Sequence, residues 1–176
     1  MIAPKAKSLE FEGVRVGDTV VYAAHGVGRV VARGQNQVGE TERDCVVVEL
    51  ATGLRVTLSV DEAGERLRQV ADEKQLENVR RTLSAASPVR DSKWTTRIKE
   101  SKAKLAGGRP AELAELVRDG SRFEADGARL SHAERRLYLQ ARELLIREIC
   151  SARGLEQDEA EAWIEAQIAA SDGDGD

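Results

Sequence analysis

Two kinds of sequence pattern meet at Ser84-Ala85-Ala86-Ser87-Pro88 in this chain of 176 residues. Small residues followed by a proline interrupt regular structure, because proline lacks a backbone donor and restricts the residue before it. Upstream of this stretch the pattern is mostly that of short strands, and downstream it is helical. We therefore predict an α+β protein of two domains, over residues 14–87 and 88–170. Residues 1–13 are expected to form a flexible N-terminal extension.

The upstream half contains β-branched runs of strand length. They are Thr19–Tyr22, Gly26–Val31, Cys45–Leu50 and Leu54–Val60. The last two form a predicted hairpin around Ala51-Thr52-Gly53, and the second of them alternates apolar and polar residues. Short strands joined by glycine-bearing turns predict a small, strongly bent β-barrel, with the polar stretch 33–43 as a loop at a hairpin tip. A helix over residues 73–83 is predicted to end this domain.

The downstream half predicts a bundle of helices. The first runs from about Ser92 to Ala106 and stops at Gly107-Gly108, and the second starts at Pro110 and ends near Asp119. The third opens with a capping box, in which Ser131 precedes Glu134 by three residues, and continues to about Cys150. A final helix carries Trp163, which we expect in the core.

Charge is unevenly distributed along the chain, although its net value is only −4. Residues 88–110 hold seven basic side chains against Asp91 and Glu100. The last 23 residues hold eight acidic side chains and no basic one, and we expect the tail 171–176 to be disordered. Exposed charges act over about 8–10 Å, so local charge matters to a phosphate more than the total does. The basic segment fits nucleic-acid binding, and it also fits a solvated helix face.

Little in the sequence supports catalysis. Asp18 and His25 have no nucleophile motif around them. Gly26-Val27-Gly28 runs into a strand, whereas the glycine motif of dinucleotide-binding proteins opens a helix. Two separate cysteines, Cys45 and Cys150, and two histidines give no zinc-ligand pattern. We therefore expect a protein that is not an enzyme and that uses no metal or cofactor.

The sequence contains no candidate membrane segment. No run approaches the roughly 18 apolar residues that a spanning helix needs. The lysines near the N-terminus are not followed by the apolar stretch of a secretory signal. These observations favour the cytoplasm and no membrane partner.

Trp94 stands out because it begins a basic helix directly after the predicted linker. Tryptophan usually packs in a core, and Trp94 fits that interpretation. However, the same helix offers Ile98 and Leu105 for burial without it. An apolar ring beside several cations also suits a wedge against an unstacked base or an interface anchor. The residues alone leave these alternatives open.

Three motifs in order resemble the CarD/CdnL family of bacterial transcription regulators. They are Val16-Gly17-Asp18-Thr19-Val20-Val21-Tyr22-Ala23-Ala24-His25-Gly26-Val27-Gly28, then the Trp94 helix ending in Leu105-Ala106-Gly107-Gly108, then Glu115-Leu116-Val117-Arg118-Asp119 followed by Leu130-Ser131-His132-Ala133-Glu134-Arg135-Arg136. Each motif is weak alone, but together they span about residues 14–170 in the family's order.

The resemblance implies how the helical domain works. It implies a contact with promoter DNA at the upstream edge of the −10 element, where Trp94 wedges into the minor groove and stabilises the open complex. The basic positions that match the family's DNA-facing ones are Arg97, Lys99 and Arg135. Helix geometry adds Lys93 and Lys102.

For the N-terminal domain, the resemblance implies a Tudor-like module that docks on the β-subunit of RNA polymerase. The same module occurs in transcription-repair coupling factors. The expected polymerase contacts are Arg55 and Thr57, and Thr57 stands where the family often has a basic residue. The resemblance also implies a cytoplasmic, nucleoid-associated protein without a small-molecule substrate. The alternative hypothesis is a protein–protein adaptor of polymerase or repair machinery that does not bind DNA directly.

Overall fold

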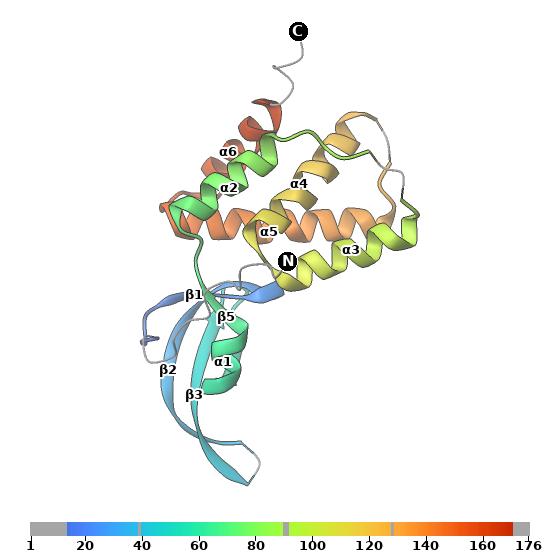
Figure 1. Cartoon of the computed structure of the whole chain (residues 1–176). Helices are drawn as coiled ribbons and strands as arrows, with labels where there is room; N and C mark the ends of the chain where they lie inside the picture. The colour runs from blue at the N-terminus through green and yellow to red at the C-terminus, as the bar shows by residue number, and fades with distance from the viewer. Residues whose placement is uncertain (1–13, 39, 90–91, 128, 171–176) are drawn as a thin grey trace. The chain divides into compact units, whose positions relative to one another are not determined.

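The computed structural model describes residues 14–38, 40–89, 92–127 and 129–170 (Figure 1). The chain divides into two compact units, with the division between Val70 and Ala71. The first unit is built mainly of strands and the second of helices, so the predicted α+β organisation in two domains is confirmed. Each unit is described below by itself.

The described residues of the first unit form an antiparallel sheet of five strands. Its elements are β1 (Thr19–Tyr22), a 3-10 helix (Ala23–His25), β2 (Gly26–Val38), β3 (Thr41–Leu50), β4 (Arg55–Ser59), α1 (Val60–Arg66) and β5 (Leu67–Gln69). The strand order is β4-β3-β2-β1-β5. An irregularity between Val30 and Ala32 shifts the β2–β3 register, and such bulges increase strand twist and bending.

The sheet does not close into the barrel that we predicted. Its order leaves β4 at one edge and β5 at the other, and no ladder joins them within the described residues. The short helix α1 carries the chain from one edge strand to the other and buries Ala63 in the core of this unit. A helix therefore covers part of the core that closing strands would otherwise cover.

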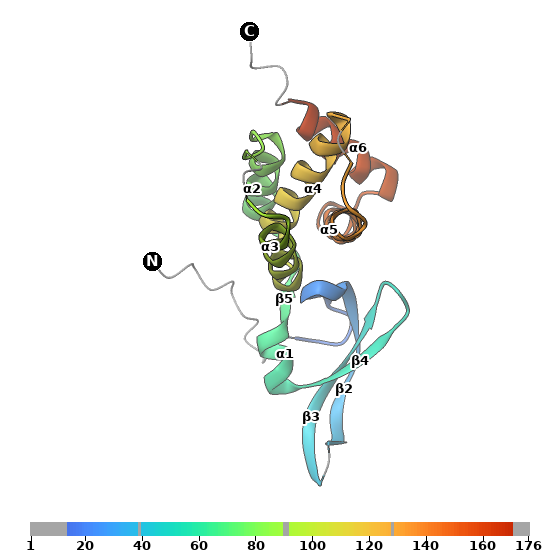
Figure 2. The ribbon, with the colours of Figure 1, turned by 90° about the vertical axis from the view of Figure 1, so that its right-hand side faces the viewer.

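The β2–β3 hairpin is longer than the sequence indicates. Its two strands form a long curved ribbon (Figure 2). The stretch expected as a loop, residues 33–43, is almost entirely paired, and the ladder runs on to Val38 opposite Thr41. The described side chains of its outer part are exposed, so backbone pairing rather than burial forms these strands. The periodicity of apolar residues gives no signal for such a ribbon.

Valines dominate the core of the first unit. One cluster of buried residues consists of Val14, Val20, Val30, Val46, Val48, Leu50, Leu58, Ala63 and Leu67. Gly28 allows β2 to pass close to β3, because a Cβ there would lie 2.7 Å from a methyl group of Val48 and 3.0 Å from the carbonyl of Glu49. This close approach, rather than any ligand, explains the second glycine of Gly26-Val27-Gly28.

The described part of the second unit contains five helices. They are α2 (Glu73–Ser84), α3 (Trp94–Gly107), α4 (Pro110–Ala125), α5 (His132–Arg153) and α6 (Gln157–Ala169). The expected helix signals are present: Pro110 opens α4, Ser131 and Glu134 form a reciprocal capping box at α5, and left-handed Gly108 and Gly154 end α3 and α5. The helix starts and stops read from the sequence are thus largely confirmed.

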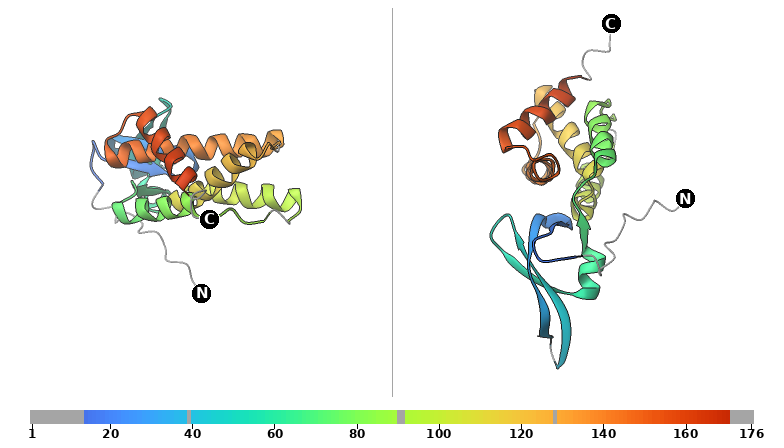
Figure 3. Two further views of the ribbon diagram at one scale, coloured as in Figure 1. Left: turned by 90° about the horizontal axis from the view of Figure 1, so that it is seen from above. Right: turned by 90° about the vertical axis from the view of Figure 1, so that its left-hand side faces the viewer.

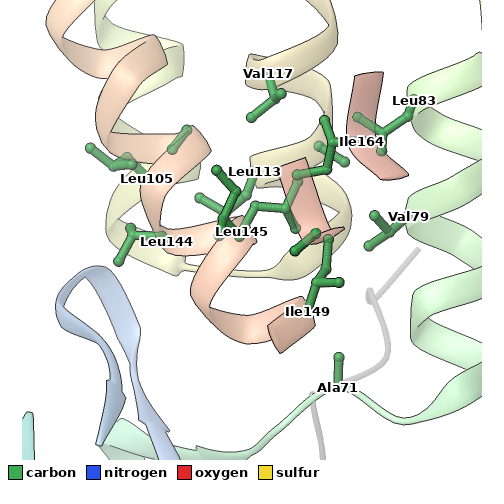
Figure 4. Close-up of a cluster of buried hydrophobic side chains, with 14 of the residues drawn as sticks. Ala71, Val79, Leu83, Leu105, Leu113, Val117, Leu144, Leu145, Ile149 and Ile164 are labelled. Atoms are coloured by element: carbon green, nitrogen blue, oxygen red, sulfur yellow. The ribbon is translucent and has the colours of Figure 1, made fainter. Parts of the chain in front are cut away.

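Helix α2 belongs to the helical unit, not to the β-rich domain in which we predicted it. Its buried residues Leu76, Val79 and Leu83 join one hydrophobic cluster with residues of α3 to α6. In Figure 4, Val79 and Leu83 point toward Ile149 and Ile164. A hydrogen bond also attaches the residues just before α2 to α5, since the amide of Ala71 donates to the Glu148 carboxylate at 3.0 Å. The boundary between the units therefore lies before α2, because the buried side chains of α2 pack in the core of the second unit.

Helix α4 extends beyond the end near Asp119 that we predicted. It continues through Gly120 to Ala125. A Cβ at Gly120 would lie 2.4 Å from the ring of Tyr138 on α5. The glycine is therefore a packing feature of the α4–α5 contact and not a helix stop.

Candidate nucleic-acid interface

Trp94 is the first residue of α3; its side chain is half-exposed, but a hydrogen bond holds its ring. It continues the stripe formed by the buried residues Ile98 and Leu105, but it lies one turn beyond them. Its exposed fraction is 47%, and it is not part of the buried cluster of the helical unit. Its indole N–H donates a hydrogen bond of 3.0 Å to the Ser131 hydroxyl. The core is thus filled without Trp94, while one edge of the ring is anchored.

The residue that receives this bond caps α5. The N-terminal ends of α3 and α5 lie together at one end of the unit (Figure 3). The Ser131 hydroxyl accepts from the Glu134 amide at 3.3 Å and donates to the Glu134 carboxylate at 2.8 Å. Two acceptor lone pairs and one proton are all that a hydroxyl offers. Every one of them is engaged, which leaves the hydroxyl little freedom to rotate.

Arg97 extends this network rather than pointing freely into solvent. Its Nε and Nη2 each donate to the same oxygen of Glu134 at 3.2 Å, and its Nη1 donates to the Ser92 carbonyl at 2.6 Å. The side chains are 25% exposed for Arg97 and 10% for Glu134. Of the cations expected to face DNA, Arg97 is therefore the one most occupied by contacts within the protein.

Three other predicted residues, in α3 or at its N-terminal cap, are exposed. Lys93 is the N-cap residue and gives the helix no side-chain cap. Lys99 and Lys102 share one exposed stripe with Thr95 and Ala106. Within the described part of the chain, none of these lysines forms an ion pair. Two neighbouring cations of α3 and its following turn are paired instead, Lys104 with Glu115 and Arg109 with Glu112.

The start of α5 adds further positive charge near Ser131. Arg135 is exposed and lies 3.4 Å from the carboxylate of Glu124. Arg129 and Arg136 are also exposed. Neither residue was among the predicted DNA contacts, although their clustering with Arg135 in the sequence was a usable signal. The structure therefore brings together Trp94, Lys93 and the first turn of α5.

The two predicted polymerase contacts lie on β4. Arg55 and Thr57 are both exposed, and they alternate with Val56 and Leu58, which turn toward the core. The Nε of Arg55 donates to the Glu49 carboxylate at 2.6 Å across the β3–β4 pair. Because β4 is an edge strand, one side of its backbone is not paired within the sheet.

No catalytic arrangement emerges in the described ranges. The ring of His25 stacks on that of Tyr22 at 4.7 Å, a structural contact. Cys45 is buried and Cys150 is half-buried, where burial raises the pKa of the Cys150 thiol. Among the residues that the structure describes, no three His, Cys, Asp or Glu side chains gather as metal ligands. Nor does any described helix have the length and apolar character to cross a membrane.

Comparison with known proteins agrees with this division of the chain. Residues 14–71 match the CarD-like/TRCF RID domain, and residues 78–165 match the CarD C-terminal domain. A protein of Bacillus subtilis (strain 168) named "Putative transcription factor YdeB" is 24% identical over 151 residues, which cover 85% of this chain and 98% of that protein. With both of its units matched in order, the chain belongs to the CarD/CdnL family of transcription regulators.

Proposed function

We propose that this protein docks on the β-subunit of RNA polymerase through its sheet and stabilises the open promoter complex through Trp94. The observation that carries the proposal is the state of Trp94, a half-exposed ring held at the edge of a basic surface while the core is filled without it. The proposed function requires no cofactor. It acts as a non-catalytic regulator.

Contacts with the DNA backbone come from exposed cations on α3 and α5. Lys93, Lys99 and Lys102 carry charge that no carboxylate in the described residues neutralises, and Arg135 is only loosely paired at 3.4 Å. Neutralising about three or four phosphates gives weak, salt-sensitive affinity without sequence preference. The protein therefore needs a second anchor at the promoter.

RNA polymerase supplies that anchor in our proposal. The matched domain is named for its interaction with RNA polymerase, and the B. subtilis relative carries the name of a transcription factor. Strand β4 presents an unpaired edge with Arg55 and Thr57 exposed along it, which suits pairing with a strand of another protein. Docking there raises the effective concentration of the α3–α5 surface at the promoter.

Trp94 makes the effect specific to melted DNA. A wedge requires an unstacked or widened base step, which exists only after opening begins, so the ring binds the open state in preference. Stacking of one aromatic side chain on a base is worth roughly 1–3 kcal/mol, which corresponds to a shift of about 5- to 150-fold in the opening equilibrium.

The test is the lifetime of the open complex on one bacterial promoter. We expect Trp94→Ala to abolish most of the prolongation while polymerase binding is unchanged. Leu139→Ala is the matched control, because Leu139 on α5 is an apolar side chain of nearly equal exposure, 48%. An unchanged lifetime with Trp94→Ala would contradict the proposal.

The adaptor hypothesis gives a different salt dependence. A protein anchor on Trp94 barely responds to salt, whereas DNA affinity falls steeply between low and physiological salt. The two hypotheses are separated by measuring the affinity of the polymerase–promoter complex for the full chain at two salt concentrations. Salt-independent recruitment together with no crosslink from residue 94 to DNA favours the adaptor.

A further inference from the structure

The hydrogen bond from Trp94 joins two helices whose contact residues are 37 positions apart. A tryptophan in the first turn of a helix with no side-chain cap has little neighbouring structure to fix its rotamer. The bond to Ser131 holds the Nε1 edge of the ring against the start of α5. About half of the side chain nevertheless stays accessible, since its exposed fraction is 47%.

The Ser131 hydroxyl is itself held in place by its neighbours. It donates its proton in a hydrogen bond to one carboxylate oxygen of Glu134, and the same oxygen also accepts from the Ser131 amide at 3.0 Å. The other carboxylate oxygen of Glu134 takes both hydrogen bonds from Arg97. Arg97 lies one turn along α3 from Trp94, so the chain of contacts leaves α3, passes through the cap of α5 and returns to α3.

We propose that Ser131 is a positioning residue that fixes the orientation of the Trp94 ring, with Glu134 and Arg97 as its support. The inference rests on the proposed function, since an orientation matters only if the ring binds something. A ring that is already oriented loses less side-chain entropy when it enters a base step. The same logic gives Arg97 a supporting role in place of a phosphate contact.

Spectroscopy of the free protein tests the positioning directly. The chain has two tryptophans, so its indole N–H groups give two NMR signals that Trp94→Phe assigns. We expect Ser131→Ala and Ser131→Gly to accelerate solvent exchange of the Trp94 indole proton, and Ser131→Thr, which keeps a hydroxyl, to preserve the slow exchange. The Trp163 signal serves as an internal reference.

Two controls separate ring positioning from helix capping. Glycine is a much better N-cap residue than alanine, so a pure capping role predicts that Ser131→Gly resembles wild type. Positioning predicts that the glycine and alanine variants behave alike. Ser59→Ala removes the same kind of capping box, at α1, and has no tryptophan partner. We expect it to leave the Trp94 signal unchanged.

The open-complex lifetime then connects position to function. We expect Ser131→Ala and Ser131→Gly to shorten it by roughly two- to tenfold, the equivalent of one hydrogen bond, and Ser131→Thr to leave it nearly unchanged. In a Trp94→Ala background Ser131→Ala should have no further effect, because both changes act through one ring.

The variant Glu134→Gln distinguishes two roles of Arg97, because each role predicts an opposite change in binding. If Arg97 contacts phosphate, removing its carboxylate partner strengthens DNA binding. If Arg97 supports Ser131, the change weakens the open complex, and Arg97→Gln leaves the salt dependence unchanged instead of lowering its slope by about 0.9. Stronger DNA binding by Glu134→Gln overturns the supporting role.

The outcomes for the two proposals are distinguishable. If the Trp94 indole proton exchanges equally fast in wild type and Ser131→Ala, positioning is wrong whatever the promoter result. If exchange responds but Trp94→Ala does not change the open complex, the proposed function fails. If Trp94→Ala shortens the lifetime and the Ser131 variants that lose the bond do not, the positioning inference fails alone.

Discussion

At the scale of single residues, the basic side chains of α3 divide into those held by contacts within the protein and those exposed to solvent. Arg97 is tied to Glu134 and Ser92, while Lys99 and Lys102 project from the exposed face of the same helix. Counting basic residues in the sequence could not separate these groups. Only the tertiary structure separates them, because it places the carboxylate of Glu134, on another helix, beside Arg97.

Glu77 gives a pH-dependent prediction at this scale. Hydrogen bonds from Arg80, and then from Arg81, lower the pKa of the Glu77 carboxyl to about 2. A carboxyl whose pKa falls on folding stabilises the native state above its unfolded pKa, near 4.3, and this stabilisation is lost as pH falls toward 2. We expect wild type to lose more stability than Glu77→Gln between pH 5 and pH 2.

Urea unfolding of both proteins at several pH values in this window measures the difference. Because Glu77 is only partly buried, added salt should shrink this difference. Parallel pH profiles for the two proteins would show that the arginine contacts do not survive in solution.

At the scale of elements, two glycines inside helices have opposite roles. Gly120 of α4 faces the ring of Tyr138 on α5, whereas a Cβ built at Gly64 of α1 meets no atom within 4 Å beyond its chain neighbours and the backbone of its own helix. Helix propensity favours alanine over glycine by about 1 kcal/mol at both positions. Packing therefore decides the sign of the substitution at Gly120, and propensity decides it at Gly64.

The two alanine substitutions form a matched pair. We expect Gly120→Ala to destabilise the protein by about 1–3 kcal/mol, because the ring of Tyr138 and the helix backbone must move apart. Gly64→Ala should stabilise it by about 0.5–1 kcal/mol. Chemical denaturation followed by far-UV circular dichroism measures both. A stabilising Gly120→Ala would mean that Tyr138 can leave its position without cost.

At the scale of the whole molecule, each unit encloses a hydrophobic cluster of its own. The cluster of the helical unit includes Ala71 and three residues of α2. Arg118 and Arg122 reinforce this by donating to the carbonyls of Thr82 and Ala85 at the end of α2. The break at Ser84–Pro88 that we expected to separate the domains is thus a connection inside the second unit.

This location of the boundary predicts how fragments behave. Residues 71–176 should fold cooperatively, whereas residues 88–176 should not, because loss of α2 exposes the apolar surface that Leu76, Val79 and Leu83 cover. Thermal unfolding and the dispersion of amide NMR signals compare the fragments. A cooperatively folded 88–176 fragment would restore the boundary at residue 88.

Local patterns determined much of this protein. Helix starts and stops depend on residues within four positions of one another, so they can be predicted from the sequence. Examples are the capping box of Ser131 and Glu134, the glycines that end α3 and α5, and the proline at the start of α4. The motifs also identified the family, and with it the tryptophan on which the proposed function rests.

Only the tertiary structure decided the rest. Four features depend on contacts between residues that are distant in sequence. They are the packing of α2 on the helical unit, the strand order that leaves the sheet open, the bond from Trp94 to Ser131, and the pairing of Arg97 with Glu134. Such contacts leave no periodic signal in a single chain, because their partners are chosen by shape and by the need of each buried polar group for a hydrogen bond.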